Sequence, residues 1–288
     1  MPFRHVFAAM LATLPANCCG VVIDDFTAGP ITVTTNGDRF DEVFATQDGL
    51  PTDQVASGGR DFRVQQRDEV ISLAVDPSDG GRLIYQSGGL SGINTFLNYV
   101  AAEPIDLAPS GENALVLSFE STAFDFEFFP GRNTLGFLDL TIDSPSGGSY
   151  DYIAVRSSAE PFNLAIPFSL LGRFDPRAFT RLQLGTSNGN LHGSFALSAI
   201  TTEQLAPADY NGDGSIDAAD YTAWRDNADP ERFYRYQGDG NGDGLVDPAD
   251  YLVWQAAYGG GNAASVPEPA AIALALLATL ALARRAQH

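Results

Sequence analysis

Carboxylate and amide side chains recur at fixed intervals in two twelve-residue segments toward the C-terminal end of the chain. The first segment spans residues 209–220 and the second spans residues 239–250, thirty residues further on. Oxygen-bearing side chains stand at positions 1, 3, 5, 9 and 12 of each segment, and glycine stands at position 6. Oxygen atoms are the ligands that Ca²⁺ prefers, and this spacing lets one turning loop direct them at a single ion. The pattern predicts two calcium ions.

Each position of such a loop has its own task. Position 7 supplies a backbone carbonyl, so its side chain is free to vary, and glycine at position 6 permits the sharp turn. Position 12 is aspartate, whose arm is shorter than that of glutamate, so the following helix must sit closer to the ion. The predicted ligands are Asp209, Asn211, Asp213, Ser215, Asp217 and Asp220 for the first ion, and Asp239, Asn241, Asp243, Leu245, Asp247 and Asp250 for the second.

A short helix is expected after each loop. Asp217 and Asp247 are predicted N-caps, and an aspartate three residues after each completes a capping box. Both helices contain the motif Asp-Tyr-x-x-Trp, and in the second helix Tyr251, Trp254 and Tyr258 lie on one face. The duplicated Tyr and Trp side chains predict the shared core of a small two-helix unit.

Residues 206–260 resemble a type I dockerin, a calcium-folded module of two loop–helix repeats in which aspartate at position 12 is usual. The resemblance implies docking into a cohesin-like partner and tethering to a larger assembly, often one that degrades polysaccharide. Loop positions 10 and 11, where cohesin contacts commonly fall, are Ala218-Ala219 and Pro248-Ala249, and they lack hydroxyl groups. A dockerin-like fold that serves as a structural spacer is the alternative.

The balance of charge points to calcium and away from nucleic acid. The chain has 36 acidic and 16 basic residues and a net charge of −20, and each predicted loop carries four of the aspartates. Without a divalent cation these carboxylates repel one another, so we expect residues 206–260 to be loose or unfolded when calcium is removed. The same acidic surface repels the phosphates of nucleic acid.

The N-terminal residues 1–20 have the features of a secretory signal. Basic Arg4 precedes an apolar run over residues 6–14, and small residues follow. A lipoprotein signal is the competing interpretation, because Cys18 and Cys19 come after the apolar run. Both cysteines of the chain lie here, so no internal disulfide is expected after cleavage.

The C-terminal residues 266–288, after a linker at 261–265, combine a Pro-Glu-Pro tripeptide, an apolar run over 270–283 and a basic pair. This order resembles the PEP-CTERM sorting signal, which implies transient membrane anchoring, cleavage by an exosortase and delivery to the outer cell surface. A plain membrane anchor is the alternative, although fourteen apolar residues fall short of the ~20 that span a bilayer comfortably. The residues of the predicted motif are Pro267, Glu268, Pro269, Arg284 and Arg285.

The middle of the chain, residues 21–203, alternates apolar and polar residues in short runs separated by glycine-rich turns. This predicts a mainly β domain, an antiparallel β-sandwich of the jelly-roll type, with a first strand near 21–26. Its architecture is broadly similar to carbohydrate-binding and galactose-binding-like jelly rolls. The clearest further strands are expected at 62–65, 70–75, 115–119, 138–142, 150–155, 179–184 and 194–200.

A catalytic site has little support in the sequence. Asp125 and Glu127, with Glu120 nearby, would point to one side of a strand roughly 6.5–7 Å apart, which resembles a glycosidase pair. Alternation of Phe and acid is, however, ordinary for a half-solvated strand. His192 is the one histidine in the body of the domain and is expected in a turn, so a histidine-based triad is disfavoured. We therefore predict a non-catalytic protein.

Two functions remain for the sandwich. The first is a structural or adhesive role in a secreted, cell-surface-sorted protein that its calcium module tethers to a partner. The alternative is carbohydrate binding, as an accessory to polysaccharide degradation, with a polysaccharide as ligand. In that case exposed aromatic rings would stack on sugar rings, and the candidates are Tyr85, Phe96, Tyr99, Tyr150 and Tyr152.

Overall fold

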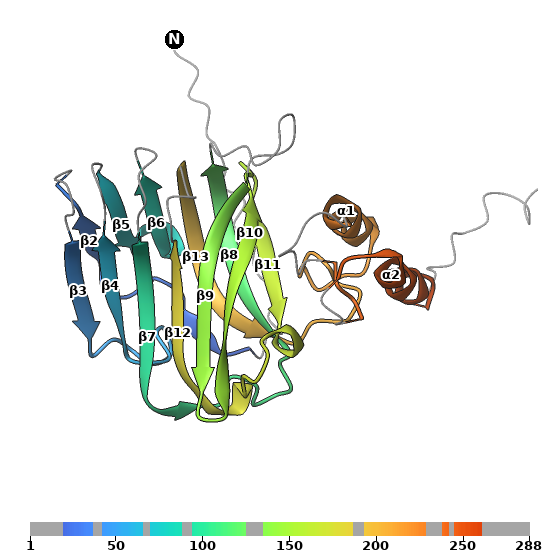
Figure 1. Ribbon diagram of the computed structural model, residues 1–288, viewed down its shortest axis with the longest axis horizontal. Helices are drawn as coiled ribbons and strands as arrows, with labels where there is room; N and C mark the ends of the chain where they lie inside the picture. The colour runs from blue at the N-terminus through green and yellow to red at the C-terminus, as the bar shows by residue number, and fades with distance from the viewer. Residues whose placement is uncertain are drawn as a thin grey trace, which may run out of the picture.

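The computed structural model describes residues 20–36, 42–65, 70–87, 94–124, 135–186, 193–228, 238–241 and 245–260. Within these ranges the protein is a mainly β, antiparallel two-sheet sandwich followed by two short helices, as predicted (Figure 1). Figure 1 shows the helices at one end of the sandwich, beyond β11. Most of the predicted signal (1–19) and all of the linker and sorting segment (261–288) lie outside the described residues.

One sheet has seven strands in the order β11-β8-β13-β6-β5-β2, and β1 also pairs with β13. Every pairing in it is antiparallel. Four of the predicted strands fall here, within a few residues of their expected ends. The strands are β1 (Val22–Asp24), β2 (Ile31–Thr34), β5 (Ile71–Asp76), β6 (Arg82–Ser87), β8 (Ala114–Phe124), β11 (Phe162–Pro167) and β13 (Gly193–Glu203).

The other sheet has six strands in the order β10-β9-β12-β7-β4-β3, again all antiparallel. The strands are β3 (Glu42–Asp48), β4 (Gly59–Gln65), β7 (Asn94–Ile105), β9 (Leu135–Ser144), β10 (Gly147–Arg156) and β12 (Phe179–Thr186). Three single-turn 3₁₀ helices complete the domain: η1 (Ser78–Gly80), η2 (Phe168–Leu170) and η3 (Pro176–Ala178).

The hydrophobic core lies between the two sheets. Alternate residues of each strand point inward, so Phe62 of β4, Leu97 of β7, Phe119 of β8 and Leu182 of β12 are all at most 2% exposed. The residues next to them in each strand point to the other side of the sheet, which is the period-two pattern of a half-buried strand. The alternation in the sequence is thus explained by one buried face on each sheet.

Two of the predicted sugar-stacking aromatics belong to this core, so that prediction was wrong for them. Tyr85 is 1% exposed and stacks on Phe195, with ring centroids 5.1 Å apart. Tyr99 is fully buried and donates its hydroxyl hydrogen to Asp24 over 2.7 Å. Large rings bury more apolar area than most side chains, and a tyrosine can enter a core when its hydroxyl finds a partner there.

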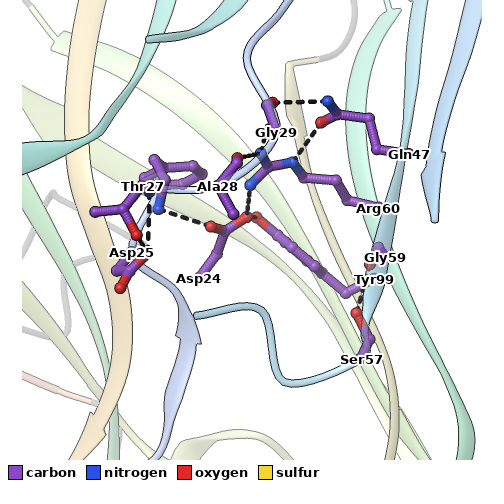
Figure 2. Close-up of polar contacts among 11 residues, drawn as sticks. Asp24, Asp25, Thr27, Ala28, Gly29, Gln47, Ser57, Gly59, Arg60 and Tyr99 are labelled. Atoms are coloured by element: carbon purple, nitrogen blue, oxygen red, sulfur yellow. Dashed lines mark hydrogen bonds and ion pairs between the residues drawn. The ribbon is translucent and has the colours of Figure 1, made fainter. Parts of the chain in front are cut away.

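A buried polar cluster fixes the start of the sandwich (Figure 2). Arg60 of β4 forms an ion pair with Asp24 at 2.5 Å, and neither side chain is exposed. The guanidinium also donates to the carbonyl oxygens of Ala28 and Gly29 and to the side chain of Gln47. Arg60 is therefore surrounded by four oxygen acceptors, which offset the cost of burying its charge.

The two helices are α1 (Ala218–Asn227) and α2 (Pro248–Gly260). Asp217 is the N-cap of α1 and forms the predicted capping box with Asp220. The same pair of contacts recurs at α2, where Asp247 accepts from the amide of Ala249 and donates its own amide hydrogen to Asp250. In the described part of the chain, no helix is long and apolar enough to cross a membrane.

Candidate functional site

The outer face of the six-stranded sheet carries aromatic and planar polar side chains in register. One row of residues crosses all six strands and consists of Tyr150, Thr141, Gln183, Asn98, Asp61 and Thr46. The adjacent row crosses five strands and consists of Asp139, Gly185, Phe96, Arg63 and Phe44. These residues alternate along each strand with residues of the core, so both rows lie on the side of the sheet that faces away from the core, although Asp139 and Gly185 are themselves buried there.

Several rings on this outer face are held open to solvent. Phe44 is 66% exposed, and the guanidinium carbon of Arg63 lies 5.6 Å from its ring centroid. Tyr150 is 55% exposed, and its hydroxyl donates to Asp139 over 3.3 Å. A Cβ at position 185 would collide with the ring of Phe96, so the absence of a side chain there lets that ring lie across the neighbouring strand.

The polar side chains between the rings are tied together. Arg181 lies 3.2 Å from Asp143 and donates to Gln183 over 3.3 Å. Arg63 donates to Glu42 over 2.7 Å. Such pairs hold amide, carboxylate and guanidinium groups in fixed planes beside the rings. The two rows, taken with the neighbouring Glu42, Asp143 and Arg181, include four acids (Glu42, Asp61, Asp139 and Asp143) against Arg63 and Arg181, so this set of side chains has a small negative charge.

The first predicted calcium loop is closed by hydrogen bonds to its own side chains. The carboxylate of Asp209 accepts from the backbone amides of Asp213 and Gly214, over 3.1 and 2.9 Å. Asn211 Oδ1 accepts from the amide of Asp213, and Asp213 accepts from the amide of Ser215. The side chains at positions 1, 3 and 5 thus gather around one turn.

The aspartate at position 12 connects the two ends of each loop. Asp220 is fully buried and accepts from the amides of Tyr210 and Asp217, each over 2.7 Å, and from a third amide at 3.2 Å. Asp250 is also fully buried and accepts from three amides in the same relative positions. The two loops therefore share one design.

Burial and neighbouring carboxylates alter the acidity of the loop. The pKa of Asp209 is raised to about 6, mainly by burial; the amides of Gly214 and Asp213 lower it, and the charges of Asp220 and Asp213 add to the rise. Burial also raises the pKa of Asp220, although three amide hydrogen bonds oppose the rise. Carboxylates that resist ionisation beside one another are the groups that a divalent cation would stabilise.

The chemistry of the donor set suits calcium, which prefers hard oxygen ligands. Within the described ranges, no three His, Cys, Asp or Glu side chains come together closely enough to form a metal cluster by themselves. In the first loop the oxygens point instead at backbone amides, and Asn211 and the carbonyl at position 7 would complete the set. In the second loop, Asp243 lies outside the described residues, and Leu245, whose side chain is exposed, would offer its backbone carbonyl as predicted for position 7.

The two helices exchange hydrogen bonds symmetrically. The indole of Trp224 donates to the carbonyl of Asp247, and the indole of Trp254 donates to the carbonyl of Asp217, both over 2.9 Å. Tyr251, Trp254 and Tyr258 lie on one face of α2 as predicted, since the successive ring centroids are 5.7 and 4.7 Å apart. The Tyr and Trp rings of both helices form one continuous cluster, as the repeat predicts.

The sandwich also buries one acid with a shifted pKa, at Asp24. Removal from water raises its pKa, while the charge of Arg60 and hydrogen bonds from Arg60 and Tyr99 oppose the rise. Asp24 and Tyr99 are fully buried and Arg60 is 2% exposed. A substrate could not reach this cluster, so we assign it to the fold.

Of the residues weighed for catalysis in the sequence, only Glu120 lies within the described residues. Asp125, Glu127 and His192 lie outside the described residues. Glu120 lies on β8, in the sheet opposite the aromatic face, 3.6 Å from the guanidinium of Arg82. That ion pair gives Glu120 a structural role.

Two surface cavities offer other candidates. One of about 490 Å³ lies on the outer side of the seven-stranded sheet, and its lining holds neither charged nor aromatic side chains: Val70, Ser72, Gln86, Ser87, Ala123, Gly193 and Ser194. The other, of about 460 Å³, lies between the sandwich and the calcium loops and is lined in part by Glu112, Asn113, Phe168 and Tyr210. Neither combines exposed rings with planar polar groups as the six-stranded sheet does.

Of the five aromatics predicted from the sequence, the structure places Phe96 and Tyr150 on the outer face of the six-stranded sheet. The backbone of Tyr152 pairs with Asp139, which belongs to the row that contains Phe96. The side chain of Tyr152 is not among those described. Phe44 was missed. Its signal was the segment Glu42–Asp48, in which a phenylalanine stands in phase with glutamate and threonine on the polar side of a strand.

No family model and no curated protein matches this chain. The β-sandwich is structurally similar to the family 11 carbohydrate-binding module of the cellulosomal cellulase Lic26A-Cel5E of Clostridium thermocellum. That likeness has a TM-score of 0.37 at 11% identity and covers 64% of this chain and 94% of the module. The family 11 module from Clostridium thermocellum in complex with a β-1,3-1,4-mixed-linked tetrasaccharide has a TM-score of 0.36 at 12% identity, and the match covers 64% of this chain and 95% of that one. A carbohydrate-binding module of family 28, specific for non-crystalline cellulose, has a TM-score of 0.32 at 10% identity, and the match covers 46% of this chain and 82% of that one. Because these TM-scores are low, the function of the sandwich must be inferred from its own surface.

Proposed function

We propose that the sandwich is a non-catalytic carbohydrate-binding domain and that the outer face of the six-stranded sheet is its ligand surface. The observation that carries the proposal is the pair of in-register rows, which combine the rings of Tyr150, Phe96 and Phe44 with planar polar side chains. Five inter-strand spacings make the longer row about 24 Å long. A surface of that length suits several consecutive sugar rings and therefore a polysaccharide.

The chemistry of the rows fits an uncharged glycan. The C–H face of a sugar ring is apolar and packs on an aromatic face, while its hydroxyls need both donors and acceptors. Phe44 and Tyr150 provide exposed rings at opposite ends of the face, and Asn98 and Gln183 between them offer donors and acceptors. The excess of acids over arginines on the face disfavours an anionic polysaccharide.

The test is binding of the full chain to an array of neutral soluble polysaccharides, followed by titration with the best ligand. We expect Phe44→Ala and Tyr150→Ala each to weaken binding roughly tenfold, which corresponds to about 1.4 kcal/mol. Val70→Ala is the matched control, because Val70 is 52% exposed on the opposite sheet. An array without any ligand, or two alanine variants that bind like the original protein, would remove this function.

We also propose that residues 206–260 form a dockerin-like module that binds two calcium ions. Support comes from the repeated loop design, in which the buried position-12 carboxylates Asp220 and Asp250 each accept three amide hydrogens. When bound, the ions would neutralise the clustered carboxylates of the predicted ligand sets and so let the loops order. Titration calorimetry should reveal two equivalents per chain, and a flat titration would refute the proposal.

A tethering role and a surface location complete the proposed function. Ala218, Ala219 and Ala249 are exposed at the starts of the helices, where a cohesin-like partner would make contact. Export, transient membrane anchoring and removal of the C-terminal tail by an exosortase remain expectations from the terminal segments. Mass spectrometry of the protein from the cell surface would locate both ends, and capture of a partner with calcium but not with chelator would support tethering.

A further inference from the structure

A side chain from the sandwich holds the first calcium loop. Asn163 of β11 donates its side-chain amide hydrogen to the carbonyl oxygen of Gly212 over 3.1 Å. Gly212 occupies loop position 4, between the predicted ligands Asn211 and Asp213, and is buried with a φ of +68°. A Cβ placed on Gly212 would lie 3.6 Å from the Cβ of Asn163 and 4.0 Å from that of Ala165. The peptide that separates two ligands therefore packs directly against β11.

A second attachment holds the segment that enters this loop. Asn113, just before β8, donates its side-chain amide hydrogen to the carbonyl of Leu205 over 2.9 Å, and its side-chain oxygen accepts from the amide of Leu205 over 2.8 Å. Beyond it Tyr210 is 5% exposed, and its hydroxyl donates to the carbonyl of Asp250 over 2.6 Å. The sandwich thus fixes the first loop, and the first loop in turn contacts the start of α2.

The described part of the second loop contacts the first loop. A Cβ on Gly240 would lie 2.9 Å from the carbonyl oxygen of Pro207 and 3.0 Å from a ring carbon of Tyr210. The hydrogen bond from β11 contacts the first loop directly, and it reaches the described residues of the second loop only through the first. Its effect on calcium should therefore be larger at the first ion than at the second.

We propose that Asn163 is a positioning residue for the first calcium ion and that the sandwich raises the calcium affinity of the first loop more than that of the second. The proposal rests on the proposed calcium binding. The bond from Asn163 holds the peptide between Asn211 and Asp213 in place before the ion arrives, so less conformational freedom is lost on binding. By linkage, calcium must strengthen the attachment of this loop to β11 by the same factor.

The test is calcium titration calorimetry of the full chain, for the original protein, Asn163→Ala and Asn163→Asp. One neutral hydrogen bond corresponds to a change of roughly three- to tenfold, so we expect Asn163→Ala to weaken one ion by that amount and to leave the other within about twofold. Asn163→Asp keeps the size but places a carboxylate opposite a carbonyl oxygen, and it should weaken the same ion at least as much. Thr32→Ala is the control, because Thr32 is exposed on β2 at the opposite edge of the same sheet and should change neither affinity.

Thermal unfolding of the sandwich, followed by its β-sheet circular dichroism, provides a readout independent of affinity. Saturating calcium should raise the unfolding midpoint of the original protein and raise it less in either Asn163 variant. Unchanged affinities in both variants, or an equal loss at both ions, would overturn the role of Asn163 while leaving calcium binding intact. An original protein that binds no calcium would overturn both proposals together.

Discussion

In the sandwich most buried side chains are apolar, whereas in the C-terminal module the most deeply buried ones are mainly carboxylates. Asp220 and Asp250 are fully buried, and Asp209 and Asp239 are 6–7% exposed, while the aromatic rings of the two helices are only partly covered. Apolar burial stabilises at any ionic composition, but buried carboxylates favour folding only if partners offset their desolvation. We therefore expect the module to need a bound cation in order to fold, and the sandwich to fold without one.

Removal of calcium should break the comparison most visibly. The chain has two tryptophans, Trp224 and Trp254, and both belong to the module, so tryptophan fluorescence reports on that region alone. We expect a chelator to shift the emission to longer wavelength as the ring cluster opens, while the β-sheet circular dichroism persists. Restoration by excess calcium is the control. An emission maximum that changes with neither chelator nor calcium would contradict the expected calcium requirement of the module.

The sandwich has its own charged weak point, and breaking it should have the next largest effect. Arg60→Met removes the partner of a fully buried Asp24 and should destabilise the fold by about 3–5 kcal/mol, measured by denaturant unfolding. Arg63→Met on the same strand is the matched control. Arg63 pairs with Glu42 at the surface, where an ion pair contributes about 1 kcal/mol or less. Equal effects of the two variants would show that burial of the pair is unimportant.

A substitution within the module should have a smaller effect that calcium magnifies. Asp220→Asn keeps the size of the side chain but replaces one acceptor oxygen by an NH₂ group that cannot accept from the buried backbone amides, so we expect a loss of about 1–3 kcal/mol in the stability of the module. Calcium titration followed by tryptophan emission should also show a weaker midpoint. Asp226→Asn, at an exposed position of α1, should leave that midpoint in place.

The smallest effect concerns pH at the junction of the two regions. Burial raises the pKa of Glu203, at the end of β13, and a hydrogen bond from Thr201 only partly opposes this. A raised pKa means that the group favours folding below its unfolded pKa and that this contribution is lost as pH rises through the folded pKa. Glu203→Gln should thus be more stable than the original protein at pH 7, by roughly a few tenths of a kcal/mol, and similar near pH 4. Thermal unfolding at both pH values measures it, and a variant that is less stable at pH 7 would reverse the assigned sign.

Local features of the fold could be predicted from the sequence, because they depend on residues close together in the chain. Alternation located β8, β9 and β12, and the Asp-x-x-Asp spacing located both helix starts, including the capping box of Asp217 and Asp220. Strands β3 and β7 were missed, since their alternation is mixed with polar and small residues. The order in which strands pair depends on contacts between distant segments, and no local pattern specifies it.

The binding face was only partly predictable for a related reason. Alternation shows that two sides of a strand differ, but an aromatic residue can belong to either side. Tyr99 points inward because Asp24, 75 residues away, accepts its hydroxyl hydrogen, and Phe96 lies outward three positions earlier. The contact between Asn163 and Gly212 likewise joins residues 49 positions apart. Such long-range partners are invisible in a single sequence.

The guanidinium of Arg60 is enclosed by the oxygens of Asp24, Ala28, Gly29 and Gln47. It is a positive charge that is covalently part of the sandwich. A tethered cation cannot be chelated, diluted or exchanged for another metal. If the calcium proposal holds, one chain neutralises its buried acids in two ways. The sandwich uses a covalently attached guanidinium, and the module uses calcium ions bound from solution. Under that proposal the sandwich folds at any calcium concentration, and the module acquires its shape only where calcium is plentiful.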